Sequence, residues 1–357
     1  MTLDEKVTQA CHRIEELYND TDGHCYVSFS GGKDSTVILA LIKMCEEVYT
    51  IPPNAIPAVF VNTGIELGVT VDFVKWVKEN YYPNVQIIRP EKSFDWVLKN
   101  KGKPVKSKLK SEFLRRYHHG NKSALTIMSM ITGVTPHGKK AGTSRLADKD
   151  FHLLHDTFEI DISNECCKYM KKRPFIKYER EHEMRGGLIG IRISEGGSRF
   201  VKFTNRERNN GKICTFNTHG RITKAPIIDW TDEDVDAFVE KYNVPLSEAY
   251  TKYGFQRTGC MGCPYSLRIA NDLRYLHDNE PQRYMAAMHW LMDVYIAQNV
   301  KLPFDMEYEK ERVDTWKWKY EPMRQEMLRK YRPNSRLIKD SDQLSIFDCK
   351  EEEKEEE

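Results

Sequence analysis

Hydrophobic and polar positions in the first quarter of the chain follow two alternating spacings. Apolar residues separated by three or four positions indicate amphipathic helices, and short apolar runs indicate buried strands. The helical spacing falls at residues 3–18, 35–46 and 69–79, and the strand pattern falls at 25–29, 58–62 and 85–88. A chain that alternates strands with helices in this way predicts an α/β fold with a doubly wound parallel sheet.

The pattern changes further along the chain. Residues 188–192 are typical of another strand of the sheet, and apolar runs on either side of residues 209–211 predict a hairpin. Thr231 precedes three acidic residues and is expected to cap a helix that ends at Lys241. Residues 267–330 combine helical spacing with many Trp and Tyr residues, which predicts a helical C-terminal region.

Charge is distributed unevenly, although the 357 residues carry a net charge of only +2. Residues 99–149 contain 13 Lys or Arg against Glu112 and Asp148, with Gly and Pro between them. We interpret the segment near 99–150 as a basic insertion or a long mobile loop, with one helix indicated near residues 123–131. Six Glu and one Lys make up residues 351–357, so we expect 336–357 to be an acidic disordered tail.

The sequence also limits where the protein is expected to work. No run approaches the roughly 18 apolar residues that a membrane span requires. The first residues show neither the basic nor the apolar region of a secretory signal. We therefore expect a cytoplasmic protein with no membrane partner, in which the nine cysteines do not form a disulfide framework.

The strongest chemical signal is Ser30-Gly31-Gly32-Lys33-Asp34-Ser35, which joins a predicted strand to a predicted helix. Glycines let a ligand approach the backbone closely. The N–H groups of such a loop and the helix N-terminus attract phosphate oxygens. The hydroxyls of Ser30, Ser35 and Thr36 add hydrogen-bond donors, and Lys33 adds a positive charge. A Gly-Gly turn alone would be a weak signal, but the whole string in this context predicts a nucleotide phosphate site.

This string resembles the pyrophosphate loop of N-type ATP pyrophosphatases and of the 3′-phosphoadenylyl sulfate (PAPS) reductase family. Val61-Asn62-Thr63-Gly64-Ile65-Glu66 resembles the second motif of that family, with Asn62 where an Asp is usual. The segment from Gly190 to Arg199 resembles the third motif, which carries arginines. The similarity covers roughly residues 20–265.

The resemblance implies an adenine nucleotide alpha hydrolase-like domain over residues 1–265, followed by a helical region at 266–335. It implies that Asn62, Thr63, Gly64 and Glu66 line the nucleotide site. Arg192 and Arg199 are then expected to bind phosphate or sulfate, because Arg suits bidentate recognition of oxyanions. For these two arginines, a surface ion pair is the alternative.

Four cysteines are grouped as Cys166-Cys167 and Cys260-Met261-Gly262-Cys263. Thiolates are ligands for iron–sulfur clusters and for zinc. Adenylyl sulfate reductases carry the same Cys-Cys and Cys-x-x-Cys arrangement, so the resemblance implies a 4Fe–4S cluster on Cys166, Cys167, Cys260 and Cys263. Zinc and unligated cysteines remain the alternatives.

Two reactions are compatible with this family. Its reductases attack sulfate with a cysteine in a C-terminal Glu-Cys-Gly-x-His-type motif, which this sequence lacks. Cys349 lies in the tail, where the six glutamates after it disfavour a thiolate. Lys33 stands where the reductases commonly carry an acidic residue, and a lysine there favours a full triphosphate.

We therefore expect ATP to be cleaved to AMP and pyrophosphate, with Lys33, Asp34 and Arg192 as catalytic residues. The adenylated acceptor would then receive sulfur, and Mg²⁺ is expected with ATP, on Asp34. A PAPS or adenylyl sulfate reductase that forms sulfite with a thiol donor is the alternative.

The partners are less defined. The basic segment at 99–149 favours contact with nucleic acid phosphates, so thiolation of a nucleic acid is one hypothesis. A solvated lid over the nucleotide explains the same charges equally well. A protein that donates sulfur or electrons is a further expected partner. A third hypothesis is a non-catalytic nucleotide sensor or a cluster-bearing interaction protein, with the aromatic C-terminal helices as its partner surface.

Overall fold

The computed structural model of the chain describes residues 1–48, 51–195, 214–218 and 221–339. The chain forms two compact units. Unit 1 comprises residues 1–94 and 168–260, and unit 2 comprises residues 95–167 and the chain from 261 onward. This division differs from the continuous 1–265 domain that the sequence suggests, because the basic segment folds with the C-terminal helices and not with the sheet.

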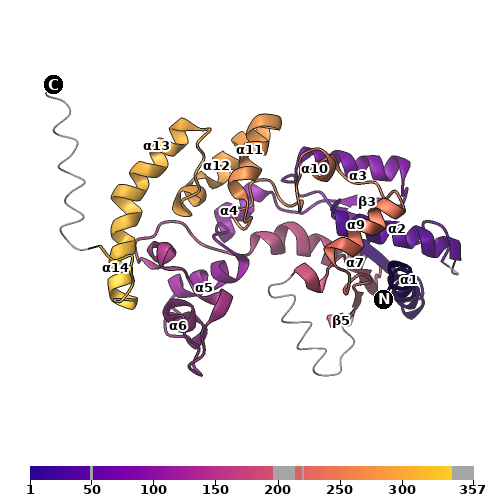
Figure 1. The fold of residues 1–357 in the computed structure, drawn as a ribbon, viewed down its shortest axis with the longest axis horizontal. Helices are drawn as coiled ribbons and strands as arrows, with labels where there is room; N and C mark the ends of the chain where they lie inside the picture. Colours follow the sequence, from indigo (N-terminus) through magenta and orange to yellow (C-terminus); the bar gives the residue numbers. More distant parts are fainter. Residues whose placement is uncertain (49–50, 196–213, 219–220, 340–357) are drawn as a thin grey trace. The chain divides into compact units, whose positions relative to one another are not determined.

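Unit 1 is built around a six-stranded sheet with the order β3-β2-β1-β4-β6-β5. Neighbouring strands of the sheet run parallel, except for β5, which runs antiparallel to β6 at one edge. The predicted α/β fold with a doubly wound parallel sheet is confirmed (Figure 1). The strands are β1 (Cys25–Ser28), β2 (Ala58–Val61), β3 (Val85–Ile88), β4 (Gly186–Leu188), β5 (Thr215–Thr218) and β6 (Arg221–Lys224).

Helices cover both faces of this sheet. Cys25 and Val27 of β1 face the main core, which also receives apolar side chains from α1, α2, α3 and α9. Tyr26, which lies between them, faces the opposite side and packs with Tyr178 of α7. This alternation follows from the two-residue period of a strand. The helices of unit 1 are α1 (Leu3–Asp20), α2 (Lys33–Val48), α3 (Gly68–Asn80), the π-helical turn η3 (Lys168–Lys172), α7 (Arg173–Glu181), the turn η4 (Ile193–Glu195), α9 (Asp232–Lys241) and α10 (Glu248–Thr251).

One local prediction differs from the structure. The strand expected at 188–192 is β4, Gly186–Leu188, and Arg192 lies in the segment after it. A Cβ on Gly186 would lie 2.8 Å from Leu17 of α1 and from Thr21, the C-cap of that helix, so the glycine allows close packing of helix and strand. The hairpin expected around residues 209–211 lies outside the described residues. The observed hairpin pairs β5 with β6.

The helix predicted after Thr231 is confirmed. Its capping box is complete, because the Thr231 hydroxyl accepts a hydrogen bond from the Asp234 N–H and the Asp234 carboxylate accepts one from the Thr231 N–H.

Unit 2 is helical, including the basic segment for which the sequence suggested a loop. α5 buries Leu114 and Tyr117, and α6 buries Ile127, Met130 and Ile131. The helix indicated near residues 123–131 corresponds to α6, whereas α5 was not predicted. Four of the eleven residues of α5 are Lys or Arg, so its apolar side is narrow. The helices of unit 2 are α4 (Phe94–Lys101, which begins at the last residue of unit 1), α5 (Lys108–His118), α6 (Leu125–Thr132), the turns η1 (Gly142–Ser144) and η2 (Asp148–Leu154), α11 (Ile269–Asn279), α12 (Pro281–Ala297), α13 (Met306–Thr315), the π-helical turn η5 (Trp316–Tyr320) and α14 (Glu321–Tyr331).

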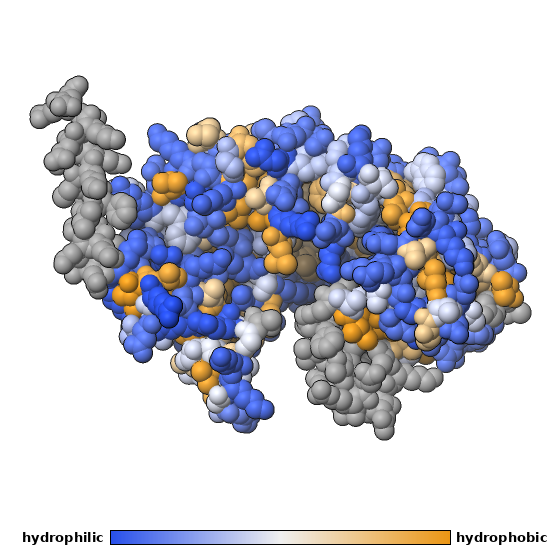
Figure 2. Space-filling model, viewed as in Figure 1, coloured by the Kyte–Doolittle hydropathy of each residue, from blue (hydrophilic) through white to orange (hydrophobic). Residues whose placement is uncertain are grey.

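The described helices share one negative property. None of them combines the length and the apolar composition that crossing a membrane requires. The face of the molecule drawn in Figure 2 is mainly hydrophilic, with separate small hydrophobic patches. The expected acidic tail at 336–357 lies mostly outside the described residues, which end at residue 339.

Candidate functional site

The Ser30–Ser35 loop connects the end of β1 to the first turn of α2. Gly31 has a φ of +71°, which glycine adopts at little cost, and a Cβ there would lie 3.0 Å from methyl groups of Thr70 and Val74. The hydroxyls of Ser35 and Thr36 donate to the carbonyl of Gly32, at 2.8 and 3.0 Å. The loop thus turns sharply into the N-terminus of a 16-residue helix, where N–H groups and the helix dipole favour an anion.

The loop lies at the topological switch point of the sheet. β1 pairs with β2 on one side and with β4 on the other, so the strand order reverses at β1. Ligands of open parallel sheets bind beyond the carboxyl ends of the strands at such a point. The segment after β4 approaches the loop closely, since a Cβ on Gly190 would lie 3.0 Å from the carbonyl carbon of Asp34.

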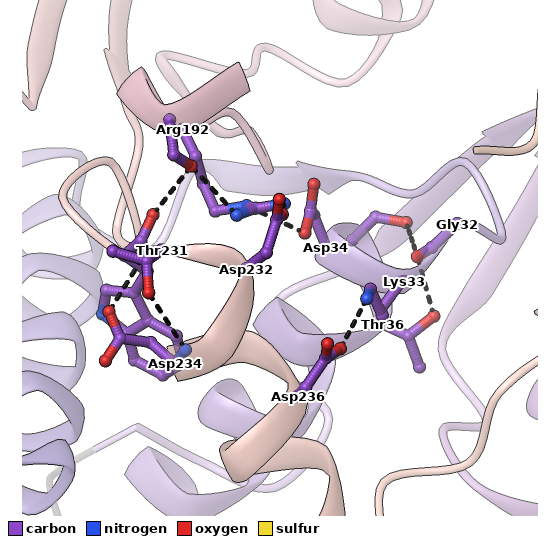
Figure 3. Close-up of polar contacts among 12 residues, drawn as sticks. Gly32, Lys33, Asp34, Thr36, Arg192, Thr231, Asp232, Asp234 and Asp236 are labelled. Carbon is purple, nitrogen blue, oxygen red and sulfur yellow. Dashed lines mark hydrogen bonds and ion pairs between the residues drawn. The ribbon is translucent and has the colours of Figure 1, made fainter. Parts of the chain in front are cut away.

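Lys33 and Arg192, two of the predicted site residues, form ion pairs with carboxylates at this point (Figure 3). Lys33 Nζ lies 2.6 Å from Oδ1 of Asp236 on α9. Arg192 is only 4% exposed and lies between two acids. Its Nε is 3.1 Å from Asp34 Oδ1, and its Nη2 is 2.7 Å from Asp232 Oδ1. The Arg192 side chain is therefore buried, and it pairs with the mostly covered Asp34 and with the exposed Asp232.

This network sets the charges beside the loop. Burial raises the pKa of the Asp34 carboxyl, and the neighbouring Arg192 guanidinium partly opposes that rise. The hydrogen bond from Arg192 lowers the pKa of Asp232. Arg192 therefore positions the Asp34 carboxylate at the start of α2 and favours its ionised form.

The second motif forms a tight turn after β2. Glu66 is buried, and its carboxylate accepts hydrogen bonds from the N–H of Thr63 at 3.0 Å and from the Thr63 hydroxyl at 2.6 Å. Asn62 Oδ1 accepts a hydrogen bond from the N–H of Gly64 at 3.0 Å. An Asp oxygen could accept the same bond, so Asn62 preserves the shape of the turn and removes one negative charge.

An open pocket of about 130 Å³ brings the first two motifs together at the ends of β1 and β2. Aromatic rings, hydroxyls, one basic and one acidic side chain line it, which suits a planar ligand with polar substituents. Neither Lys33 nor Arg192 lines this pocket. The lining residues include Ser30, Phe60, Glu66, Thr70, Lys171, Phe175 and Thr258.

Tyr250 and Thr258 also contact the loop, and the sequence assigned them no role. The N–H of Lys33 donates to Tyr250 Oη at 3.1 Å, and Tyr250 Oη lies 3.2 Å from Thr258 Oγ1. A Cβ on Gly32 would lie 3.2 Å from both of these oxygens, so a side chain at this position would crowd the contact. The two residues are far from the loop in sequence, and only their position within the segment of family resemblance pointed to them.

Three of the four grouped cysteines, Cys166, Cys167 and Cys263, belong to unit 2. The Sγ atoms of Cys166 and Cys167 are 4.0 Å apart. Burial raises the pKa of Tyr265, and the three cysteines raise it further. Cys260 is the last residue of unit 1 and bridges to Glu66 through the backbone.

These thiols match an iron–sulfur cluster in donor type, since soft sulfur ligands are what iron–sulfur clusters require. Within the described part of the chain, however, no group of three or more His, Cys, Asp or Glu side chains lies in a metal-binding arrangement. The cluster is therefore a prediction from the residue types and from the resemblance.

The sequence profile of the phosphoadenosine phosphosulfate reductase domain matches residues 24–134 and 136–266. The chain belongs to this family. The match covers unit 1 from residue 24 onward, nearly all of the segment of unit 2 at 95–167, and residues 261–266 of unit 2.

Two curated proteins are similar to the chain at low identity. An uncharacterized protein of Methanocaldococcus jannaschii is 24% identical over 270 residues, which are 74% of this chain and 47% of the relative. An adenosine 5′-phosphosulfate reductase of Neisseria meningitidis is 24% identical over 160 residues, 42% of this chain and 59% of the reductase. The chain thus spans about half the length of the curated relatives that it matches.

Solved structures give weaker similarities. A PAPS reductase of Candida auris is 16% identical, with a TM-score of 0.41, over 72% of this chain and 93% of the reductase. A U34-tRNA thiolase of Methanococcus maripaludis, solved with its 4Fe–4S cluster, is 13% identical, with a TM-score of 0.37, over 84% of this chain and 81% of the thiolase. At these scores the family assignment rests on the domain match.

Two residues of the family-based prediction lie outside the described part of the chain. Arg199, expected to bind phosphate or sulfate, falls within residues 196–213, and Cys349 falls beyond residue 339. Their roles therefore stay as predicted from the sequence.

Proposed function

We propose that this member of the family binds ATP at the Ser30–Ser35 loop and cleaves it between the α and β phosphates. The observation that carries the proposal is the position of Lys33, which lies in the first turn of α2 beyond the carboxyl end of β1. A helix N-terminus, a glycine turn and a lysine together suit the negative charge that develops on departing pyrophosphate. Asp34, oriented by Arg192, supplies the hard oxygen ligand that Mg²⁺ prefers.

The reaction that follows is adenylation of an acceptor. An acceptor oxygen forms a bond to the α phosphorus, and the bond from that phosphorus to the bridging oxygen breaks, so pyrophosphate leaves. A sulfur nucleophile then replaces the activated oxygen, and AMP leaves with it. The 4Fe–4S cluster on Cys166, Cys167, Cys260 and Cys263 would supply a site for sulfur or electrons when bound. A nucleic acid is the proposed acceptor, and a sulfur or electron donor protein the proposed partner.

The basic segment supports this acceptor only in part. Several of its cations form ion pairs with carboxylates of unit 2, which reduces the charge available for phosphates. The remaining exposed cations include Lys108, Lys139, Lys140 and Lys149. The neutralised ones form the pairs Lys99–Asp95, Lys103–Asp293, Lys106–Asp150, Lys122–Asp156 and Arg145–Asp148. A salt-dependent gel shift with RNA and DNA tests the surface, and no binding at low salt would remove this acceptor.

A release assay tests the reaction. Protein purified without oxygen is incubated with ATP, Mg²⁺ and candidate acceptors, and pyrophosphate and AMP are measured. Lys33→Gln should abolish release, whereas Lys78→Gln, an exposed lysine on α3, should leave it unchanged. Binding of PAPS or adenylyl sulfate without any affinity for ATP would reverse the proposal.

The second candidate function is reduction of PAPS or adenylyl sulfate to sulfite. The similarity to the adenosine 5′-phosphosulfate reductase of Neisseria meningitidis favours it. Sulfite formed from either substrate in the presence of a thiol, with no pyrophosphate from ATP, would establish it. A chain that binds nucleotides and catalyses neither reaction would instead be a sensor.

A further inference from the structure

A second pocket in unit 1 lies along α7 and the edge strand β3. Its volume is about 540 Å³, and it shares no lining residue with the pocket at the Ser30–Ser35 loop. Small-molecule sites in proteins have volumes of roughly 300–1,000 Å³, so this pocket is large enough for one. The proposed reaction at the loop uses none of its lining residues.

One face of α7 gives this pocket a positive lining. Arg173, Lys177 and Arg180 follow each other at intervals of four and three positions, so they lie on the same side of the helix. Arg89 and Lys92 add two cations from the segment after β3. Five basic side chains face only two acidic ones, Glu91 and Glu181, and this excess favours an anionic ligand.

Both acidic side chains of the pocket, Glu91 and Glu181, form ion pairs with the same lysine. Lys177 Nζ lies 3.0 Å from Glu91 Oε1 and 3.9 Å from Glu181 Oε1. By contrast, the guanidinium groups of Arg89 and Arg180 form no ion pair or hydrogen bond with any residue that the structure describes. Two arginines that line one pocket and lack a carboxylate partner are suited to grip a phosphate group.

Flat rings form another part of the lining. The Arg173 guanidinium carbon lies 4.0 Å from the centre of the Tyr169 ring, and the rings of Tyr178 and His182 are 4.2 Å apart. Aromatic rings and arginine planes stack with nucleobases, largely independently of base identity. The pocket therefore combines a phosphate-binding pair with surfaces for a planar heterocycle.

We propose that the α7–β3 pocket is a second nucleotide site, which binds a 5′-mononucleotide unit through Arg89 and Arg180. The phosphate lies between the two guanidinium groups, and the base contacts the Tyr169–Arg173 stack. The unit is either a free mononucleotide or part of a single-stranded oligonucleotide. This site does not depend on the reaction proposed for the Ser30–Ser35 loop.

The test uses ligands that lack adenine, so that the loop does not compete. Binding of cytidine monophosphate and of a fluorescent ten-residue oligocytidylate is measured on the full chain at low salt. The wild-type protein should bind at least one of them. In the Arg89→Gln/Arg180→Gln variant, affinity should fall about a hundredfold, because each arginine–phosphate contact contributes on the order of tenfold.

Controls separate this site from general charge and from the loop. Lys78→Gln removes one exposed positive charge from α3 and should change the affinity less than about twofold. Lys33→Gln should remove ATP binding and leave cytidine monophosphate binding unchanged. The Arg89→Lys/Arg180→Lys variant keeps the charge and should show an intermediate loss, since lysine lacks the bidentate fork.

The outcomes are distinct. Binding of the monophosphate identifies a free nucleotide, and binding of the oligonucleotide alone identifies a strand. If the wild-type protein binds neither ligand, the proposal is overturned, whether or not the variants fold. Unchanged affinity in the double variant, or an equal loss in Lys78→Gln, overturns it as well.

Discussion

Lys33 Nζ and Asp236 Oδ1 are 2.6 Å apart, so the lysine at the start of α2 forms an ion pair with a carboxylate of α9. Asp236 is largely exposed and Lys33 is mostly covered. A phosphate group at the loop would compete with Asp236 for the same ammonium group. The pair therefore keeps Lys33 at the loop and makes its availability depend on the ligand.

This competition predicts that Asp236→Asn strengthens ATP binding. Loss of the carboxylate frees Lys33, and because exposed ion pairs are weak we expect a two- to fivefold gain, on the order of a surface pair. Calorimetric titration with ATP and with pyrophosphate measures it. Asp72→Asn, which removes an exposed carboxylate paired with Lys75, is the matched control and should have no effect. Weaker ATP binding in Asp236→Asn would show that the carboxylate itself serves the ligand.

Gly31→Ala should damage the loop itself. The left-handed backbone at a φ of +71° costs an L-residue about 1–2 kcal/mol, and the new methyl group would also meet Thr70 and Val74 at 3.0 Å. We expect a lower unfolding midpoint and loss of ATP binding. Gly254→Ala has a φ of +66° with open space around the Cβ, so it tests the backbone cost alone. Equal effects of the two substitutions would contradict the steric argument.

His152 should make the stability of unit 2 depend on pH. Burial lowers its pKa from 6.5 to about 3, and its ring packs against Trp316 at 4.7 Å and Tyr320 at 5.1 Å. The unfolded chain binds a proton below about pH 6.5 and the folded chain does not. Stability is therefore complete above that pH and falls by up to about 1.4 kcal/mol per pH unit as the pH decreases toward 3.

Denaturant unfolding between pH 4 and 8, followed by tryptophan fluorescence, measures this dependence. His152→Phe removes the titration and should flatten the slope, although the variant also loses the hydrogen bond to the Ala297 carbonyl. His289→Gln changes an exposed histidine of α12 and should keep the wild-type slope. An unchanged slope in His152→Phe would assign the pH dependence to other groups.

The cluster prediction concerns metal content. Protein isolated without oxygen should contain about four iron and four sulfide per chain, and Cys166→Ser or Cys263→Ser should lose most of both. Cys214→Ser alters a half-buried cysteine in unit 1 and should retain them. Stoichiometric zinc in place of iron, or iron content that is indifferent to all of these substitutions, would contradict the prediction.

The sequence by itself predicted the first three strands of the sheet and the loop that follows β1. The spacing of apolar residues identified β1, β2, β3 and the helices between them. Successive residues of a strand face opposite sides of the sheet, as Tyr26 and Val27 of β1 do. The Gly-Gly-Lys-Asp string predicts a phosphate site, because its combination of backbone freedom and positive charge suits an anion.

Only the tertiary structure decided the partners of these residues. The loop is contacted by Asp236, Tyr250 and Thr258, which lie more than 200 positions away in the chain. No local sequence pattern predicts contacts between residues so far apart. The basic segment was predicted as an insertion or a mobile loop because it is polar and contains Gly and Pro, yet Leu114 and Tyr117 are buried in unit 2, and the Tyr117 hydroxyl lies 3.2 Å from that of Tyr331. Local spacing determines secondary structure, whereas ion pairs and domain boundaries depend on which surfaces meet, and that is settled only when the chain packs.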